Sequence, residues 1–299
     1  MNKKYLISAI IVLLIILAAL GLIFLGGEDN WVCQNGEWVK RGNPSGPTPS
    51  GNCSPQATPT PTSTPEKNVT MESPKSGDRL TLPFSITGQA RTFESQVSIK
   101  VKDAQGNTLF EGFTMAQSPD IGLFGPYKKD IIYLYQKPAS QDVFVDSFEY
   151  SAKDGSVINL VSTPVKLNTD ETRTIKVFYS NNNLDPQISC NKVFPVDRII
   201  SKSGSLIENT LKALLGEMNR VDVEKEYDTN INQGTFVKSW SLKDGVARVD
   251  FNDILELNAG GSCRVSAIRA QITETLKQFP TVQEVIISID GRSEDILQP

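Results

Sequence analysis

Few residues in this chain have the chemistry that catalysis needs. Histidine is absent, which removes Ser-His and Cys-His nucleophilic pairs, two-histidine zinc motifs and the side chain best suited to proton transfer near neutral pH. Four acidic residues lie near predicted strand ends, where a glycosidase would place its paired carboxylates: Asp250, Asp253, Glu256 and Asp290. Because such residues in an acidic protein usually form turns and helix caps, we interpret them as structural and predict no catalytic residue.

Residues 201–205 (SKSGS) have the composition of a Ser-Lys hydrolase site. However, Ser205 also begins a capping box, in which its hydroxyl accepts from the Glu208 amide while the Glu208 side chain reaches back. We therefore interpret the segment as a polar loop that leads into a helix, which Gly216 is placed to end.

The four cysteines are Cys33, Cys53, Cys190 and Cys263. An even number behind an export signal favours two disulfides, and no CxxC pair supports the alternative of a zinc site. We predict that Cys33 pairs with Cys53 across about 20 residues, and that Cys190 pairs with Cys263 across about 70 residues. A redox switch would need an activated thiolate, which nothing in the sequence singles out. We expect no metal and no cofactor.

Aromatic and basic residues supply candidate partner contacts. An Asn-Gly pair between Trp31 and Trp38 predicts a short hairpin. The two indoles could bind a carbohydrate or lipid headgroups, although aromatic pairs across a short hairpin more often pack together.

The remaining candidates lie in the two folded blocks. Arg264 and Arg269, near the start of a predicted helix, could pair with a partner's carboxylate or phosphate, or be ordinary surface residues. Phe124 and Tyr127 lie in a predicted loop, where they could contact a partner or plug the end of a core.

An apolar run precedes these residues. Residues 5–25 contain no charge and are long enough to span a bilayer as a helix. Lysines before the run and acidic residues after it predict a cytoplasmic amino terminus, with the rest of the chain extracytoplasmic in the cell membrane. A cleaved signal peptide is the alternative, but the bulky end of the run favours a retained anchor over residues 1–27. No lipobox-like context surrounds Cys33.

A hairpin and stalk follow over residues 28–68, and the stalk is rich in proline, threonine and serine. Such a composition favours extended conformations and would hold the folded part away from the lipid. The net charge is -4 and no long basic run occurs, so we exclude nucleic acid as a partner.

Two folded blocks are predicted within the 299 residues. In residues 69–168, short apolar stretches alternate with turn residues and show no helical periodicity, which predicts an all-β antiparallel sandwich. In residues 172–299, the order strand, helix, hairpin, helix, strand predicts an α+β domain. Residues 285–289 are apolar on both faces, as expected of a central strand.

The second block resembles the GerMN domain of spore germination and sporulation proteins. The resemblance rests on residues 204–216, 245–251, 261–262, 271–280 and 285–291. The first block is similar to the immunoglobulin-like domain of bacterial spore germination, on residues 73–78, 86–91 and 148–164.

This resemblance implies a non-catalytic envelope protein whose α+β domain has a ring-building-like geometry used for binding or assembly. We therefore expect a membrane-anchored scaffold that binds envelope proteins, with self-association through the α+β domain as a further expectation. A module that binds peptidoglycan or surface glycan is the alternative, and an envelope hydrolase is the remote one.

Overall fold

The computed structural model describes residues 30–34, 37–51, 53 and 67–298. The predicted membrane anchor over residues 5–25, most of the stalk and the predicted Asn-Gly turn lie outside these residues. Within residues 30–298, apart from the gaps, no helix combines the length and apolar character that a membrane crossing requires. The described residues divide into two compact units, one before residue 67 and one from Lys67 onward.

The first unit is a two-stranded hairpin with a return segment. Strands β1 (Asn30–Gln34) and β2 (Glu37–Arg41) pair antiparallel, with Cys33 opposite Trp38. A disulfide joins Cys33 to Cys53, which is the predicted pairing. The Nε1 groups of Trp31 and Trp38 donate to the carbonyl oxygens of Gly46 and Gly51, at 3.0 and 3.1 Å. The two indoles therefore bind the return segment to the hairpin.

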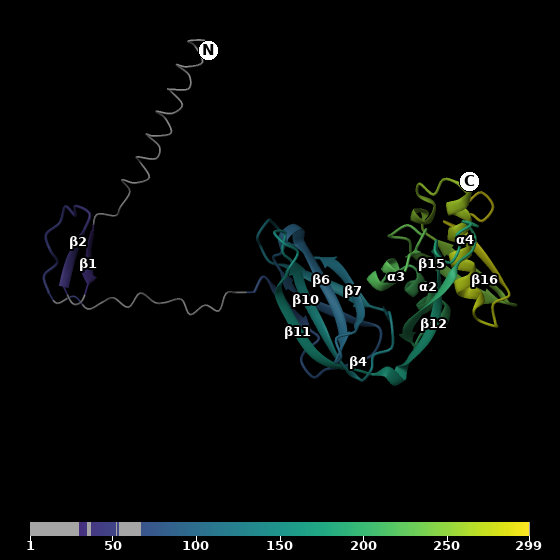
Figure 1. Cartoon of the computed structure of the whole chain (residues 1–299), viewed down its shortest axis with the longest axis horizontal. Coiled ribbons are helices and arrows are strands. Elements are labelled where there is room, and N and C mark those ends of the chain that lie inside the picture. Colours follow the sequence, from purple (N-terminus) through teal and green to yellow (C-terminus); the bar gives the residue numbers. More distant parts are fainter. Residues whose placement is uncertain (1–29, 35–36, 52, 54–66, 299) are drawn as a thin grey trace, which may run out of the picture. The chain divides into compact units, whose positions relative to one another are not determined.

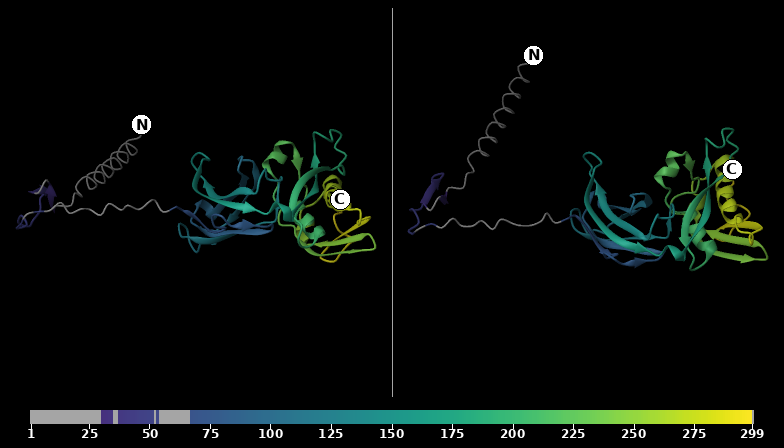
Figure 2. Two further views of the ribbon diagram at one scale, coloured as in Figure 1. Left: turned by 90° about the horizontal axis from the view of Figure 1, so that it is seen from below. Right: turned by 60° about the horizontal axis from the view of Figure 1, so that its bottom comes forward.

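The second unit begins with a two-layered β-sandwich (Figures 1 and 2). One sheet has the order β4-β11-β10-β6-β7 and the other the order β3-β5-β8. The strands are β3 (Val69–Ser73), β4 (Arg79–Leu80), β5 (Phe84–Ala90), β6 (Gln96–Asp103), β7 (Thr108–Met115), β8 (Gly125–Ile131), β10 (Asp142–Tyr150) and β11 (Val157–Leu167). The predicted immunoglobulin-like sandwich is confirmed, although the short strand β4 pairs with β11 in parallel.

Alternation of side chains explains why these segments form strands around one core. In β5, every second residue from Phe84 to Ala90 is buried, because successive side chains of a strand point to opposite faces of its sheet. Gly88 belongs to this buried set. A Cβ atom there would lie 2.0 Å from the Thr70 oxygen and 2.7 Å from the Tyr127 hydroxyl, so only glycine lets Tyr127 pack at this point.

The α+β part contains two further sheets. Their strands are β12 (Thr172–Asn181), β13 (Phe194–Ser201), β14 (Tyr227–Asp228), β15 (Val237–Lys243), β16 (Val246–Phe251) and β17 (Glu284–Ile289). The helices are α2 (Leu206–Leu214), α3 (Arg220–Glu224) and α4 (Ser262–Lys277). Helix α4 packs on β12 and β17, and α2 packs on β12, β13 and α4. A disulfide joins Cys190 to Cys263, at the start of α4, again as predicted.

The structure corrects three local predictions. Strand β17 lies at the edge of the sheet β15-β16-β17 and pairs in parallel with β16, so it is not a central strand. Its apolar character has another cause, since α4 packs against it. Ser205 Oγ accepts from the Glu208 amide at 3.2 Å, but the Glu208 carboxylate pairs with Lys212 at 2.6 Å. Only half of the predicted capping box forms.

The third correction concerns Gly216. Helix α2 ends at Leu214, just before Gly216 as predicted, but Gly216 does not adopt the positive φ of a glycine C-cap. A Cβ atom at Gly216 would lie 2.3 to 2.6 Å from the ring and hydroxyl of Tyr133. Glycine is needed there because Tyr133, two residues after β8 of the sandwich, packs against the backbone.

A short strand joins the two parts of this unit. Strand β9 (Tyr133–Leu134) follows β8 of the sandwich, yet it pairs with Ile199 and Ile200 of β13. The sheet β14-β12-β13-β9 therefore contains a strand from the first predicted domain. Backbone hydrogen bonds thus cross the boundary between the two parts.

Candidate binding groove

A buried charge pair lies where the sandwich meets the α+β part. Arg198 on β13 is 1% exposed, and its Nη2 donates to Asp222 Oδ2 of α3 at 2.6 Å. The guanidinium also lies over the rings of Tyr135 and Tyr179, at 5.4 and 5.7 Å from their centroids. A buried charge needs an opposite charge or good hydrogen bonds to offset its desolvation. Asp222 supplies the opposite charge, and Arg198 Nη1 also donates to the Asp197 carbonyl oxygen at 2.9 Å.

Tyr133 and Glu217 form a second set of contacts across the junction. The Tyr133 hydroxyl donates to the Glu217 carbonyl oxygen at 2.6 Å, and burial raises the pKa of Tyr133 well above its ordinary value. Lys129 Nζ on β8 donates to Glu217 Oε1 at 2.7 Å. Glu217 Oε2 is buried without a hydrogen-bond partner among the described residues. Gly112 makes room for it, because a Cβ atom there would lie 1.7 Å from this oxygen.

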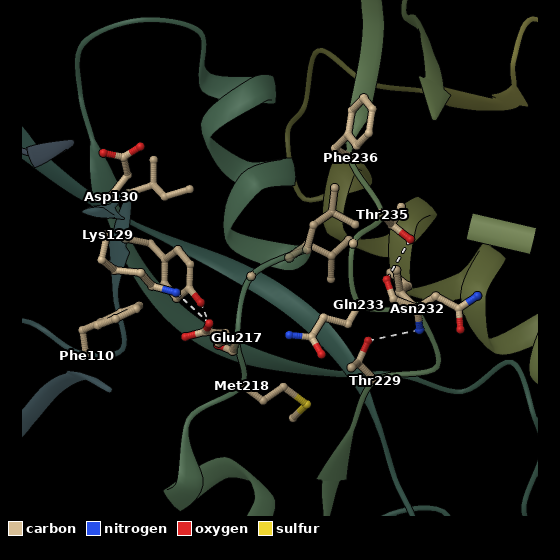
Figure 3. A pocket seen from close by; sticks show the side chains of 17 residues that line it. Phe110, Lys129, Asp130, Glu217, Met218, Thr229, Asn232, Gln233, Thr235 and Phe236 are labelled. Carbon is tan, nitrogen blue, oxygen red and sulfur yellow. Dashed lines mark hydrogen bonds and ion pairs between the residues drawn. The ribbon is translucent and has the colours of Figure 1, made fainter. Parts of the chain in front are cut away.

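A cavity of about 610 Å³ opens beside this junction (Figure 3). Its walls come from β7 and β8 of the sandwich, from the segment after α2, and from residues 229 and 231–236. Apolar groups from Phe110, Met218 and Phe236 line it together with amides from Asn232 and Gln233. The mixture of apolar surface with a few polar groups is typical of binding sites.

A second cavity of about 560 Å³ adjoins the first and shares Ile132, Leu215 and Phe236 with it. It lies between α2 and β15 and is lined on the β15 side by residues 237–240. Phe236 is 56% exposed and Trp240 is 36% exposed. We call the two adjoining cavities the α2–β15 groove.

Charges along the α2–β15 groove are compensated within the protein. Six charged side chains line it: Lys129, Asp130, Glu208, Lys212, Glu217 and Lys238. Each forms an ion pair, and the pairs are Lys129–Glu217, Lys128–Asp130, Glu208–Lys212 and Lys238–Asp290. The hydrogen bond and charge of Lys212 lower the pKa of Glu208, and those of Asp290 raise the pKa of Lys238. The groove therefore offers mainly apolar contact.

The two predicted arginine contacts, Arg264 and Arg269, do not line this groove. Arg264 donates to Asn258 O at 2.9 Å and to Asn232 Oδ1 at 2.6 Å. Arg269 donates to Ile296 O at 2.8 Å. Both guanidinium groups thus hold the protein's own loops and its carboxy-terminal segment.

The two aromatic candidates of the sandwich differ in position. Tyr127 is 3% exposed and its hydroxyl donates to the Thr70 oxygen at 2.9 Å, so it belongs to the core and is closed to a partner. Burial raises its pKa to about 12. Phe124 is half-buried beneath the Arg91 guanidinium, 4.7 Å from the ring centroid.

The acidic candidates do not converge on one site. Asp250 accepts from Ser288 Oγ at 2.7 Å and from the Gly291 amide at 2.8 Å. Asp290 pairs with Lys238, and Glu256 pairs with Arg292. In the part of the chain that the structure describes, no group of three or more Cys, Asp or Glu side chains has a metal-binding arrangement.

The Ser-Lys segment also serves local structure. Lys202 Nζ donates to the Asp170 carbonyl oxygen at 2.6 Å, and the hydroxyls of Ser201 and Ser203 bond to each other at 2.7 Å. These contacts agree with a polar loop before α2. The α2–β15 groove was not predicted from the sequence. The only sequence indication of it was the apolar residues of β15.

Two family profiles match the chain. One, described as Germane, sporulation and spore germination, matches residues 176–295. The other, described as Gmad2, the immunoglobulin-like domain of bacterial spore germination, matches residues 68–156. No curated protein matches the chain.

Similar solved structures include the tandem GerMN domains of the sporulation protein GerM from Bacillus subtilis. That match is 20% identical with a TM-score of 0.33, and it covers 41% of this chain and 40% of that one. The first GerMN domain of the same protein is 18% identical with a TM-score of 0.30, covering 40% of this chain and 85% of that one. A Clostridium perfringens protein described as a lipoprotein is 15% identical with a TM-score of 0.28, covering 43% and 81%.

The two family profiles match neighbouring segments in the order that the fold shows, with the sandwich first and the α+β part after it. The chain therefore contains an immunoglobulin-like domain of the bacterial spore germination type over residues 68–156, followed by a Germane domain of the sporulation and spore germination type over residues 176–295.

Proposed function

We propose that this chain is a non-catalytic, membrane-anchored binding protein of the bacterial envelope, and that it holds a protein partner in the α2–β15 groove. The observation that carries the proposal is the pair of adjoining cavities, of about 610 and 560 Å³, with Phe236 exposed between them. Hydrophobic side chains that are exposed in a preformed groove are typical anchor points for a partner protein.

The junction supports this proposal because it makes the groove a stable shape. The groove takes walls from both parts of the unit, so a hinge between them would change its width. Backbone pairing of β9 with β13, the Lys129–Glu217 pair and the Tyr133–Glu217 hydrogen bond all cross that boundary. A preformed site lowers the ordering cost of binding.

The apolar run at residues 5–25 supports the proposal that the chain is membrane-anchored and extracytoplasmic. Two disulfides favour an oxidising compartment, and the descriptions of both matched families refer to spore germination. Two experiments test this extracytoplasmic setting. Free cysteine thiols are mass-tagged in the denatured, unreduced protein, and protease is added to intact cells. Four modified thiols, or a chain that the protease does not reach, would contradict it.

Site-specific photocrosslinking tests the binding role. A benzophenone amino acid replaces Phe236 in the groove or, as a matched control, Phe93, which is 69% exposed and outside the groove lining. We expect a discrete crosslinked protein from position 236 in native envelopes and none from position 93. Equal labelling from both positions, or recovery of lipid or sugar without protein, would contradict the proposal. Co-sedimentation with cell-wall sacculi would instead support the glycan-binding alternative.

A further inference from the structure

The outer edge of β15 has no strand beside it within residues 67–298. In the sheet order β15-β16-β17, strand β15 pairs only with β16. Six of its seven residues are exposed, and its first four, residues 237–240, line the α2–β15 groove. An exposed strand edge presents unpaired N–H and C=O groups, and these are a template for another strand.

The turn after β15 determines which of its backbone groups face outward. Asp244 and Gly245 both have positive φ, at 51° and 79°, and they form a two-residue hairpin turn between Lys243 and Val246. The residues that flank such a turn form a hydrogen-bonded pair, and the pattern then alternates along the strand. The backbone groups of Lys243 and Ser241 therefore point to β16, and those of Leu242 and Trp240 point to the free edge.

The side chain of Trp240 lines the groove, and those of Trp240 and Leu242 line a third cavity. Trp240 lies opposite Val249, and Leu242 lies opposite Ala247. Both partners are fully buried, so this is the inner face of the sheet. The third cavity, of about 400 Å³, continues along this face between Leu242 and Phe279. Backbone groups that point to the free edge and apolar side chains that line cavities therefore occur on the same residues of β15, Trp240 and Leu242.

We propose that the free edge of β15 binds an extended, uncharged segment of the partner protein, about seven residues long, which adds to the sheet as a strand. The inference rests on the proposed function and names its ligand. Every charged side chain lining the groove already has an ion-pair partner, so a charged side chain of the segment that faced the groove would be desolvated without compensation. The chain's own stalk does not suit the site, because the prolines at positions 59, 61 and 65 lack the N–H groups that a ladder needs.

A synthetic peptide tests this edge directly. The probe is a seven-residue fluorescent peptide with blocked ends, with valine at alternate positions and threonine between them. Its binding to the full chain in lipid nanodiscs is measured by fluorescence anisotropy, with empty nanodiscs as the control for partition into lipid. We expect saturable binding to the chain and none to empty nanodiscs. No saturable binding up to millimolar concentration would overturn the proposal.

N-methylated versions of the peptide supply the matched control. Alternate amides of an added strand point to β15 and the others point to solvent. Methylating the set that points to β15 should weaken binding by about tenfold or more, because each methyl group removes a hydrogen bond to β15. Methylating the other set should change binding little. If methylation of the valine amides weakens binding, the segment adds antiparallel to β15. If methylation of the threonine amides weakens binding, it adds parallel. Equal effects of both sets would overturn strand addition.

Protein variants locate the site. Leu242→Lys should abolish peptide binding, whereas Val157→Lys, on an exposed strand of the sandwich at 49% exposure, should leave it unchanged. Circular dichroism checks that both variants fold. Equal effects of the two variants on peptide binding would overturn the assignment. So would a stable dimer, detected by light scattering, in which crosslinking places the contacts at β15. Failure of this test with a protein still crosslinked at Phe236 would leave the proposed function intact.

Discussion

Gly216 provides a sharp test of how the two parts of the main unit are held together. A methyl group at this position would lie 2.3 Å from Tyr133 Cε1 and 2.4 Å from its hydroxyl oxygen. Tyr133 is 2% exposed, so its ring has little room to move. In Gly216→Ala the ring must shift and its hydrogen bond to Glu217 must lengthen. Overpacking costs about 1–3 kcal/mol and the lost hydrogen bond about 1 kcal/mol, so we expect a cost of about 2–4 kcal/mol.

The measurement is the free energy of unfolding in urea, followed by circular dichroism. Gly260→Ala is the matched control, because Gly260 also lacks a positive φ and nothing lies within 4 Å of its Cβ position. We expect its effect to stay within about 0.5 kcal/mol, as for other surface changes.

A double variant separates the steric cause from a helix-capping cause. In a Tyr133→Ala background the clash is gone, so Gly216→Ala should cost less than about 1 kcal/mol there. A C-cap role would give the same cost with or without the tyrosine. An undiminished cost in that background, or a cost no larger than that of Gly260→Ala, would refute the reasoning.

Three further predictions concern stability. Replacing Cys190 and Cys263 with serine opens a loop of sequence separation 73 and should lower the unfolding free energy by about 4 kcal/mol; calorimetry that gave an unchanged melting temperature would contradict this. Asp222→Ala leaves the Arg198 guanidinium buried without its carboxylate, so urea unfolding should show a loss of about 3–5 kcal/mol, and a loss below about 1 kcal/mol would indicate a solvated pair. Burial raises the pKa of Tyr127 to about 12 in the folded chain, above about 10 when unfolded, so its contribution is complete below pH 10 and is lost as the pH rises from about 10 to 12. Tyr127→Phe should reduce this alkaline loss in unfolding curves measured from pH 9 to 12, and an identical pH dependence would argue against it.

Local sequence patterns predicted most of the elements. The apolar spacing of Ile207, Leu211 and Leu214 predicted a helix face, and all three side chains are buried on α2. Asp244-Gly245 predicted a hairpin, which β15 and β16 form. These predictions succeed because side-chain periodicity and turn chemistry act over a few neighbouring residues.

The junction could not be predicted in this way. Strand β9 has two residues, too few for a periodic pattern, and its partner β13 is more than 60 positions away. Arg198 has the sequence character of an exposed residue, since arginine is seldom fully buried without a partner. Its burial depends on Asp222, 24 positions later, and on Tyr135 from the other part of the unit.

Composition and spacing by themselves determined the order of the segments, the two fold classes and the absence of histidine chemistry, because each of these depends on residue types or on neighbours in the chain. Only the tertiary structure decided that β9 crosses to the second sheet, that Gly216 makes room for Tyr133, and that a groove with a free strand edge lies beside α2. These features arise where segments far apart in the sequence pack together, and no local pattern encodes which distant surfaces will meet.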